Sequence, residues 1–169
     1  PVALAIGLTT DAGPGGVTKL ASRCAELADA VGVPVFSASL ANHAALRAFG
    51  ATRVAVVTPF NAEVDQNVKA NVEEAGFEVV AIKGTEAPSL PAICETSLDD
   101  IRRVFQHVAE SNCDAILQVG TALPVVAMIE DLEAETGKPI VACNAAVYRQ
   151  TLRALGIDDH ITGFGRLFT

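Results

Sequence analysis

Short apolar runs alternate along the chain with stretches in which apolar residues recur every three or four positions. The runs are typical of buried β-strands, and the periodic stretches are typical of helices with one buried face. Strands that alternate with helices predict an α/β fold with parallel sheets and right-handed crossovers. The predicted strands are residues 2–7, 34–38, 53–58, 78–82, 115–119 and 139–142. The predicted helices are residues 17–30, 39–49, 61–76, 97–108 and 123–135, and a last helix that ends at Leu155.

A strand-to-loop junction occurs twice in the sequence. Residues 3–10 form the first copy and residues 115–122 the second, so that Thr9 falls on Thr121 and Leu8 on Gly120. The similarity continues downstream, where residues 32–35 match 137–140 and residues 46–50 match 152–156. Such self-similarity predicts a duplicated half-domain, with one site where the two copies face each other.

The two copies differ in extent, and this predicts how the chain is divided. The second unit runs from about residue 51 to 156, whereas the first is visible only from its second half onward. The repeat therefore predicts a natural protein that is roughly 55–65 residues longer at its start. We expect residues 1–50, completed by residues 145–169, to form a first lobe without its N-terminal part, and residues 51–144 to form the second lobe.

Composition and charge exclude several classes of function. Half of the residues are apolar and only 5% are aromatic, which is typical of an α/β protein with strands covered on both faces. A formal charge of −8 argues against a nucleic-acid partner, because such proteins need a basic surface. No run approaches about 18 apolar residues and no leader is visible, so we expect a cytoplasmic protein and no membrane partner.

The sequence predicts neither a metal site nor a cofactor. Four cysteines, Cys24, Cys94, Cys113 and Cys143, are widely spaced, which favours reduced thiols over disulfides or metal ligands. Residues 13–20 superficially resemble a phosphate-binding loop, but Thr18 stands where that loop needs glycine and Leu20 where it needs serine or threonine. A dinucleotide-binding glycine pattern is also absent after every predicted strand.

Hydroxyl residues at the two junctions are the candidate binding groups. Thr9, Thr10 and Thr121 stand at the predicted carboxyl ends of strands, where α/β sheets bind ligands. A hydroxyl beside free backbone amides can hold a carboxylate, and the alternative is that these threonines cap helices. Asn144 likewise either reaches the pocket or caps its helix.

Other polar residues have a structural and a functional interpretation. His43 either faces the cleft or is a satisfied structural histidine. Cys143 is the thiol nearest to the expected cleft, and it is either a small buried cysteine or a reactive thiolate. The remaining candidates are expected to cover the exposed face of a helix and not to act in catalysis: Glu130, Asp131, Glu133 and Glu135.

Five stretches, in their order and spacing, resemble the maleate isomerase and arylmalonate decarboxylase branch of the aspartate/glutamate racemase superfamily. The resemblance extends over nearly the whole chain, and it implies two pseudo-twofold-related Rossmann-like (flavodoxin-like) lobes with a small-acid site between them. The stretches are residues 53–60, 76–80, 137–141, 144–145 and 163–168.

The resemblance also implies which groups are missing. Family members use cysteine thiols at the two mirror junctions as base or nucleophile, beside hydroxyls and amides that hold a carboxylate or enediolate. In this sequence the two cysteine positions are Leu8 and Gly120, and Phe60 stands in place of the family tyrosine. The catalytic residues are therefore unknown. The implied substrate-binding group is Thr9, Thr10, Phe60, Gly120, Thr121 and Asn144.

Two functions remain open on the sequence. One is an enzyme, an isomerase/racemase or decarboxylase of a small dicarboxylate or arylmalonate-like acid, with a non-thiol base or a water held by Thr9, Thr121 or His43. The other is a catalytically silent relative that binds a small carboxylate; a homo-oligomer is compatible with either. If the binding groups persist, Gly120→Cys is expected to restore weak proton exchange.

Overall fold

The computed structural model describes residues 1–9 and 16–169, and it has the predicted α/β fold with parallel sheets. The first elements are β1 (Leu4–Ile6), α1 (Gly16–Val31), β2 (Val35–Ser37) and α2 (Ala38–Ala48). They are followed by β3 (Arg53–Thr58), α3 (Ala62–Glu74), β4 (Glu78–Gly84), α4 (Leu90–Cys94), α5 (Leu98–Ala109), β5 (Ala115–Gln118), η1 (Val126–Met128), α6 (Ile129–Thr136), β6 (Ile140–Ala142), α7 (Cys143–Ala154) and η2 (Arg166–Phe168).

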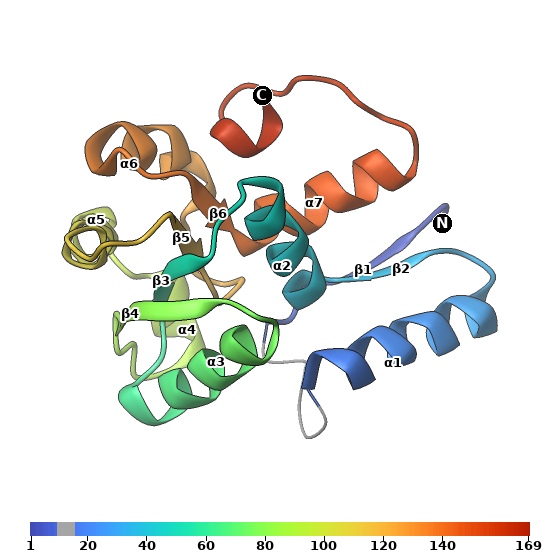
Figure 1. The fold of residues 1–169 in the computed structure, drawn as a ribbon, viewed down its shortest axis with the longest axis horizontal. Coiled ribbons are helices and arrows are strands. Elements are labelled where there is room, and N and C mark those ends of the chain that lie inside the picture. Colours follow the sequence, from blue (N-terminus) through green and yellow to red (C-terminus); the bar gives the residue numbers. More distant parts are fainter. Residues whose placement is uncertain (10–15) are drawn as a thin grey trace.

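The strands form two separate parallel sheets. Strands β1 and β2 make a two-stranded sheet, and the larger sheet has the order β4-β3-β5-β6. Helices α2 and α7 lie between the two sheets and contact both, while α5 and α6 cover the other face of the larger sheet (Figure 1). The larger sheet is therefore covered on both faces, and the residues of β5 are buried throughout.

The order of the larger sheet places a topological switch point between β3 and β5. The chain leaves β3 for its neighbour β4, then crosses to β5 on the other side of β3 and continues outward to β6. Open α/β sheets bind ligands beyond the carboxyl ends of the strands at such a reversal. In this chain those two ends are Thr58 and Gln118.

The strand register follows the sequence repeat. Leu4 pairs with Val35 in the small sheet, and Ile116 pairs with Ile140 in the large one. These are equivalent positions of the two copies, so each copy contributes the same strand pair followed by a helix, α2 or α7. Helix α7 contacts both sheets, so these contacts do not assign it to one lobe. The predicted lobe boundaries at residues 50 and 144 therefore stay a prediction.

Two helices begin at residues other than those expected. Helix α2 is capped by Ser37, whose Oγ accepts the N–H of Leu40, and not by Ser39. The helix expected at 123–135 starts only at Ile129, after the short η1 turn. Pro124 accounts for the non-helical Leu123, because the residue before a proline is disfavoured in the helical conformation.

The stretch 83–96, expected to be irregular, contains the end of β4 and the short helix α4. The Oγ of Ser89 caps α4 and Pro91 lies in its first turn, a combination that favours a helix start. Within the described residues, each helix is too short or too polar to cross a bilayer.

Candidate functional site

A cavity of about 120 Å³ lies where the two junctions meet. Its walls come from the segments that follow β1, β3 and β5, and from α4, so that it lies at the switch point of the larger sheet. We call it the junction cavity. It is lined by Leu8, Thr9, Pro59, Phe60, Leu90, Ile93, Gly120, Thr121 and Ala122.

The two junctions bind each other directly. The backbone N–H of Gly120 donates to Thr9 Oγ1 at 3.0 Å, and Thr121 Oγ1 donates to the carbonyl of Gly7 at 3.1 Å. The mirrored threonines thus face the same cavity, and Thr121 caps no helix because the next helical turn starts at Val126. Thr10, the sixth member of the expected group, lies outside the described residues.

Two side-chain amides hold the second junction in place. Asn144 Nδ2 donates to the carbonyl of Thr121 at 2.9 Å. Asn144 lies inside α7, whose N-cap is Ala142, so it does not cap this helix. It also does not line the junction cavity. Gln118 Nε2 donates to the carbonyls of Val119 and Gly120 at 2.9 and 2.8 Å. Gln118 was missed by the sequence analysis, although a single polar residue in an apolar strand is a signal for such a role.

The thiol of Cys143 is structural. Its side chain is fully buried, its Sγ lies 3.5 Å from Gln118 Oε1, and it does not line the junction cavity. Burial raises the pKa of the Cys143 thiol to about 12. A thiol that stays protonated at neutral pH is not a nucleophile, which favours the buried-cysteine interpretation.

The turn after β3 is stabilised by a buried carboxylic acid, Asp65, through the hydroxyl of Thr58. Thr58 Oγ1 accepts the N–H of Phe60 at 3.1 Å and donates to Asp65 Oδ1. Asp65 is buried, and loss of solvation raises the pKa of its carboxyl above the ordinary value of 3.8. This contact fixes the position of Phe60 in the cavity wall.

We expect Asp65→Asn to leave the free energy of unfolding unchanged or higher at pH 7. Because the folded pKa lies above 3.8, the ionised carboxyl reduces stability as the pH rises through the folded pKa, and this cost is absent below 3.8. Asparagine keeps an oxygen that can accept from Thr58 but carries no charge. Urea unfolding at about pH 3 and pH 7 measures the difference, with the exposed Asp99→Asn as control. A variant that is equally destabilised at both pH values contradicts this account.

The junction cavity offers hydrogen-bond donors but no charge among its described lining residues. The backbone N–H groups of Thr121 and Ala122 donate to no other group in the described part of the chain. Free amides in a turn, together with hydroxyls, can bind an oxyanion without a cation. Residues 1–9 and 16–169 contain no group of three or more His, Cys, Asp or Glu that could hold a metal ion.

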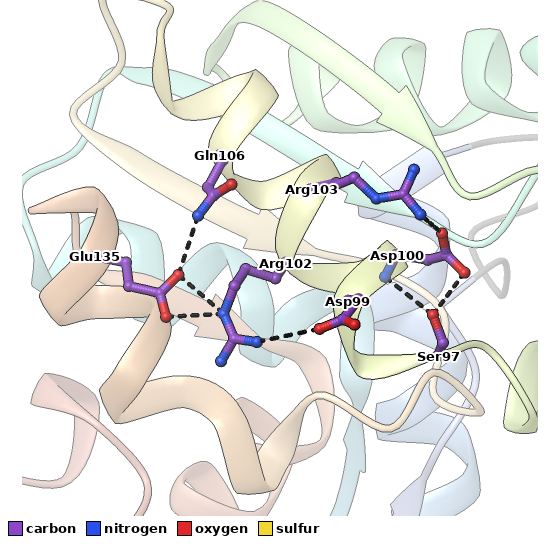
Figure 2. A network of polar contacts seen from close by, with 7 residues as sticks. All are labelled: Ser97, Asp99, Asp100, Arg102, Arg103, Gln106 and Glu135. Atoms are coloured by element: carbon purple, nitrogen blue, oxygen red, sulfur yellow. Dashed lines mark hydrogen bonds and ion pairs between the residues drawn. The ribbon is translucent and has the colours of Figure 1, made fainter.

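A larger groove of about 600 Å³ lies between α4 and α5, and it includes neither junction. Its cations are already paired: Lys83 Nζ lies 2.8 Å from Glu86 Oε1, and Arg103 contacts Asp100. Figure 2 shows Arg103 and Asp100 beside the N-cap Ser97, in the network at the start of α5. Since these charges neutralise one another, the smaller junction cavity is the better candidate for an acid.

Comparisons with known proteins find similarity over most of the chain. A family model described as arylmalonate decarboxylase matches residues 16–168. A maleate isomerase from Pseudomonas putida is 27% identical over 140 residues, which are 80% of this chain and 55% of that protein. A maleate isomerase from Geobacillus stearothermophilus is 22% identical over 160 residues, 93% of this chain and 64% of that protein. The chain therefore spans little more than half the length of such curated relatives.

Solved structures show the same fold. An arylmalonate decarboxylase crystal structure matches 99% of this chain and 75% of its own, with a TM-score of 0.90 and 22% identity. The maleate cis-trans isomerase of Nocardia farcinica bound to TRIS matches 99% of this chain and 71% of its own, with a TM-score of 0.88 and 25% identity.

Proposed function

The chain belongs to the arylmalonate decarboxylase family, and from this membership we propose that it binds a small carboxylic acid in the junction cavity. The observation that carries the proposal is the convergence of both junctions on one cavity. The expected binding residues and the two expected cysteine positions together include six residues that the structure describes. Five of these six line the cavity: Leu8, Thr9, Phe60, Gly120 and Thr121.

The size of the cavity favours a small aliphatic diacid as the ligand. Sites for drug-sized molecules measure roughly 300–1,000 Å³, whereas the junction cavity measures about 120 Å³. Apolar groups of Leu8, Phe60 and Ile93 would contact the carbon skeleton of the acid. The hydroxyl of Thr9 and the amides of Thr121 and Ala122 would bind a carboxylate.

The proposed function does not include thiol chemistry. Neither Leu8 nor Gly120 can exchange a proton or attack a carbon, and burial keeps the Cys143 thiol protonated. We therefore propose a binding protein for small acids as the better-supported function. Turnover by a non-thiol base is the alternative that the following experiment separates.

We expect maleate to raise the melting temperature of the chain and to shift the amide NMR signals of Thr121 and Ala122. Thr121→Val should weaken this binding about tenfold, because it removes the hydroxyl that holds Gly7 against the second junction. Thr85→Val is the matched control, since Thr85 lines the larger groove and not the junction cavity. Malonate, aspartate and phenylmalonate complete the panel.

The same NMR samples test for turnover. Conversion of maleate, loss of carbon dioxide or uptake of deuterium at a substrate carbon would establish an enzyme and overturn the silent-binder proposal. Equal binding by the unaltered protein and Thr121→Val, or no binding of any acid, would contradict the assignment of the junction cavity.

A further inference from the structure

A second and much smaller cavity, of about 20 Å³, shares Thr9 with the junction cavity. Its polar lining residues come from α2, α3 and the first junction. Apolar residues form the remainder of its wall. The lining residues are Thr9, Ser39, Asn42, His43, Asn71, Val68, Val72, Leu117 and Val119.

Two polar atoms of this lining lack partners among residues 1–9 and 16–169. Asn42 Oδ1 and His43 Nδ1 are fully buried and form no hydrogen bond with these residues, and their own residues are only 2% and 4% exposed. Buried polar atoms in folded proteins almost always have a partner, from the protein or from an ordered water. A buried water needs roughly 10–15 Å³ and two to four polar neighbours, and this cavity provides both.

His43 is neutral at physiological pH. Its ring lies 5.9 Å from that of Phe77, and the guanidinium of Arg47 lies 5.4 Å from the same ring centre. Burial, with a smaller contribution from Arg47, lowers the pKa of His43 from 6.5 to about 4. A neutral imidazole carries one proton, so that Nδ1 is either a donor or an acceptor.

The hydrogen-bonding capacity of Thr9 indicates whether His43 Nδ1 acts as a donor or as an acceptor. A hydroxyl has one proton and two lone pairs. The N–H of Gly120 fills one lone pair of Thr9 Oγ1. A carboxylate in the junction cavity accepts only, so Thr9 can hold it only by donating its single proton. That arrangement is favoured if a second donor, from inside the protein, fills the remaining lone pair.

We propose that the small cavity holds one water molecule, which accepts a hydrogen bond from the Nδ1–H of His43 and donates hydrogen bonds to Asn42 Oδ1 and Thr9 Oγ1. The water satisfies both orphan atoms and leaves the hydroxyl proton of Thr9 for the ligand. Asn42 and His43 are thus positioning residues that act through the water on Thr9. Their effect on an acid ligand rests on the proposed function, whereas the water and the tautomer do not.

The first test uses the unaltered protein without ligand. Long-range proton–nitrogen NMR at pH 7 should show His43 neutral and protonated at Nδ1, and no titration of its ring between pH 5 and pH 8. Nuclear Overhauser contacts should place a long-lived water beside the Asn42 amide. Protonation at Nε2, or the absence of the water, overturns the proposal whether or not any acid binds.

The second test measures maleate binding by variants. His43→Leu removes the donor and should raise the dissociation constant about tenfold, the size expected for one lost hydrogen bond. His43→Gln keeps an N–H donor and should recover most of the affinity, which a merely structural role for the ring would not predict. His107→Leu, on the exposed face of α5, is the control. Equal affinities of the Leu and Gln variants contradict the positioning role, and failure of the unaltered protein to bind overturns only the proposed function.

Discussion

Gly120→Ala is expected to destabilise the protein by roughly 2–5 kcal/mol, the sum of a backbone and a packing cost. Gly120 has φ of 99°, a conformation that residues with a Cβ rarely adopt. A Cβ at this position would lie 2.5 Å from Pro59 Cδ and 2.6 Å from Pro59 Cγ, so the Pro59–Phe60 turn must move. Chemical unfolding of the two proteins measures the difference.

Gly137→Ala is the matched control for Gly120→Ala. Gly137 also has a positive φ, of 70°, at the end of α6, but an added Cβ there would meet nothing within 4 Å. Its cost should be the backbone contribution alone, about 1–2 kcal/mol. Adding Pro59→Ala to Gly120→Ala should recover part of the larger loss, and equal losses in the two glycine variants would refute the close approach.

The same geometry argues against the expectation that Gly120→Cys restores proton exchange. A thiol at this position requires both the strained backbone and a displaced Pro59. The wall built from Pro59 and Phe60 fits glycine, and a cysteine, which the family resemblance implies at this position, could not be introduced without moving that wall. We expect Gly120→Cys to be destabilised and to give no proton exchange.

Glu133→Ala is expected to lower the free energy of unfolding by about 3 kcal/mol. The Glu133 side chain is 4% exposed, and its two oxygens accept the backbone N–H groups of Ile140 and Arg166, each at 2.8 Å. Alanine leaves both N–H groups without their acceptor, and each such loss costs about 1–3 kcal/mol when the group is buried. Thermal and urea unfolding measure the effect.

Glu135→Ala, in the same helix, is the control for Glu133→Ala. Glu135 is paired with Arg102 on the surface, at 2.8 Å, and solvent screens this pair (Figure 2). Its removal should cost less than about 1 kcal/mol. Glu133→Gln keeps one acceptor oxygen and should be intermediate, so a similar loss in all three variants would contradict the role assigned to Glu133.

Glu133 shows why the sequence analysis misplaced a residue. Four acids between residues 130 and 135 suggest an exposed face, and Glu130 and Glu135 are exposed as expected. Glu133 is buried because the C-terminal tail returns over α6 and brings the N–H of Arg166 to its carboxylate. A tertiary contact across 33 residues leaves no local periodic signal.

The candidate site was predictable in part. The repeat places Thr9 and Thr121 at equivalent junctions, and parallel strands bring their carboxyl ends to one edge of each sheet. The supporting contacts of Asn144 and Asp65 were not predictable, because they depend on distances between helices and strands. Whether the assembled cavity binds an acid remains a proposal.

By itself, the sequence determined the order of strands and helices, the parallel sheets and the equivalence of the two junctions. These properties depend on side-chain periodicity and on the repeat, which are local or internal to the sequence. Only the tertiary structure decided that Gly120 lies against Pro59, that Glu133 and Asp65 are buried, and that Thr9 lies between two cavities. The physical reason is that burial and hydrogen-bond partnership depend on which surfaces meet in space.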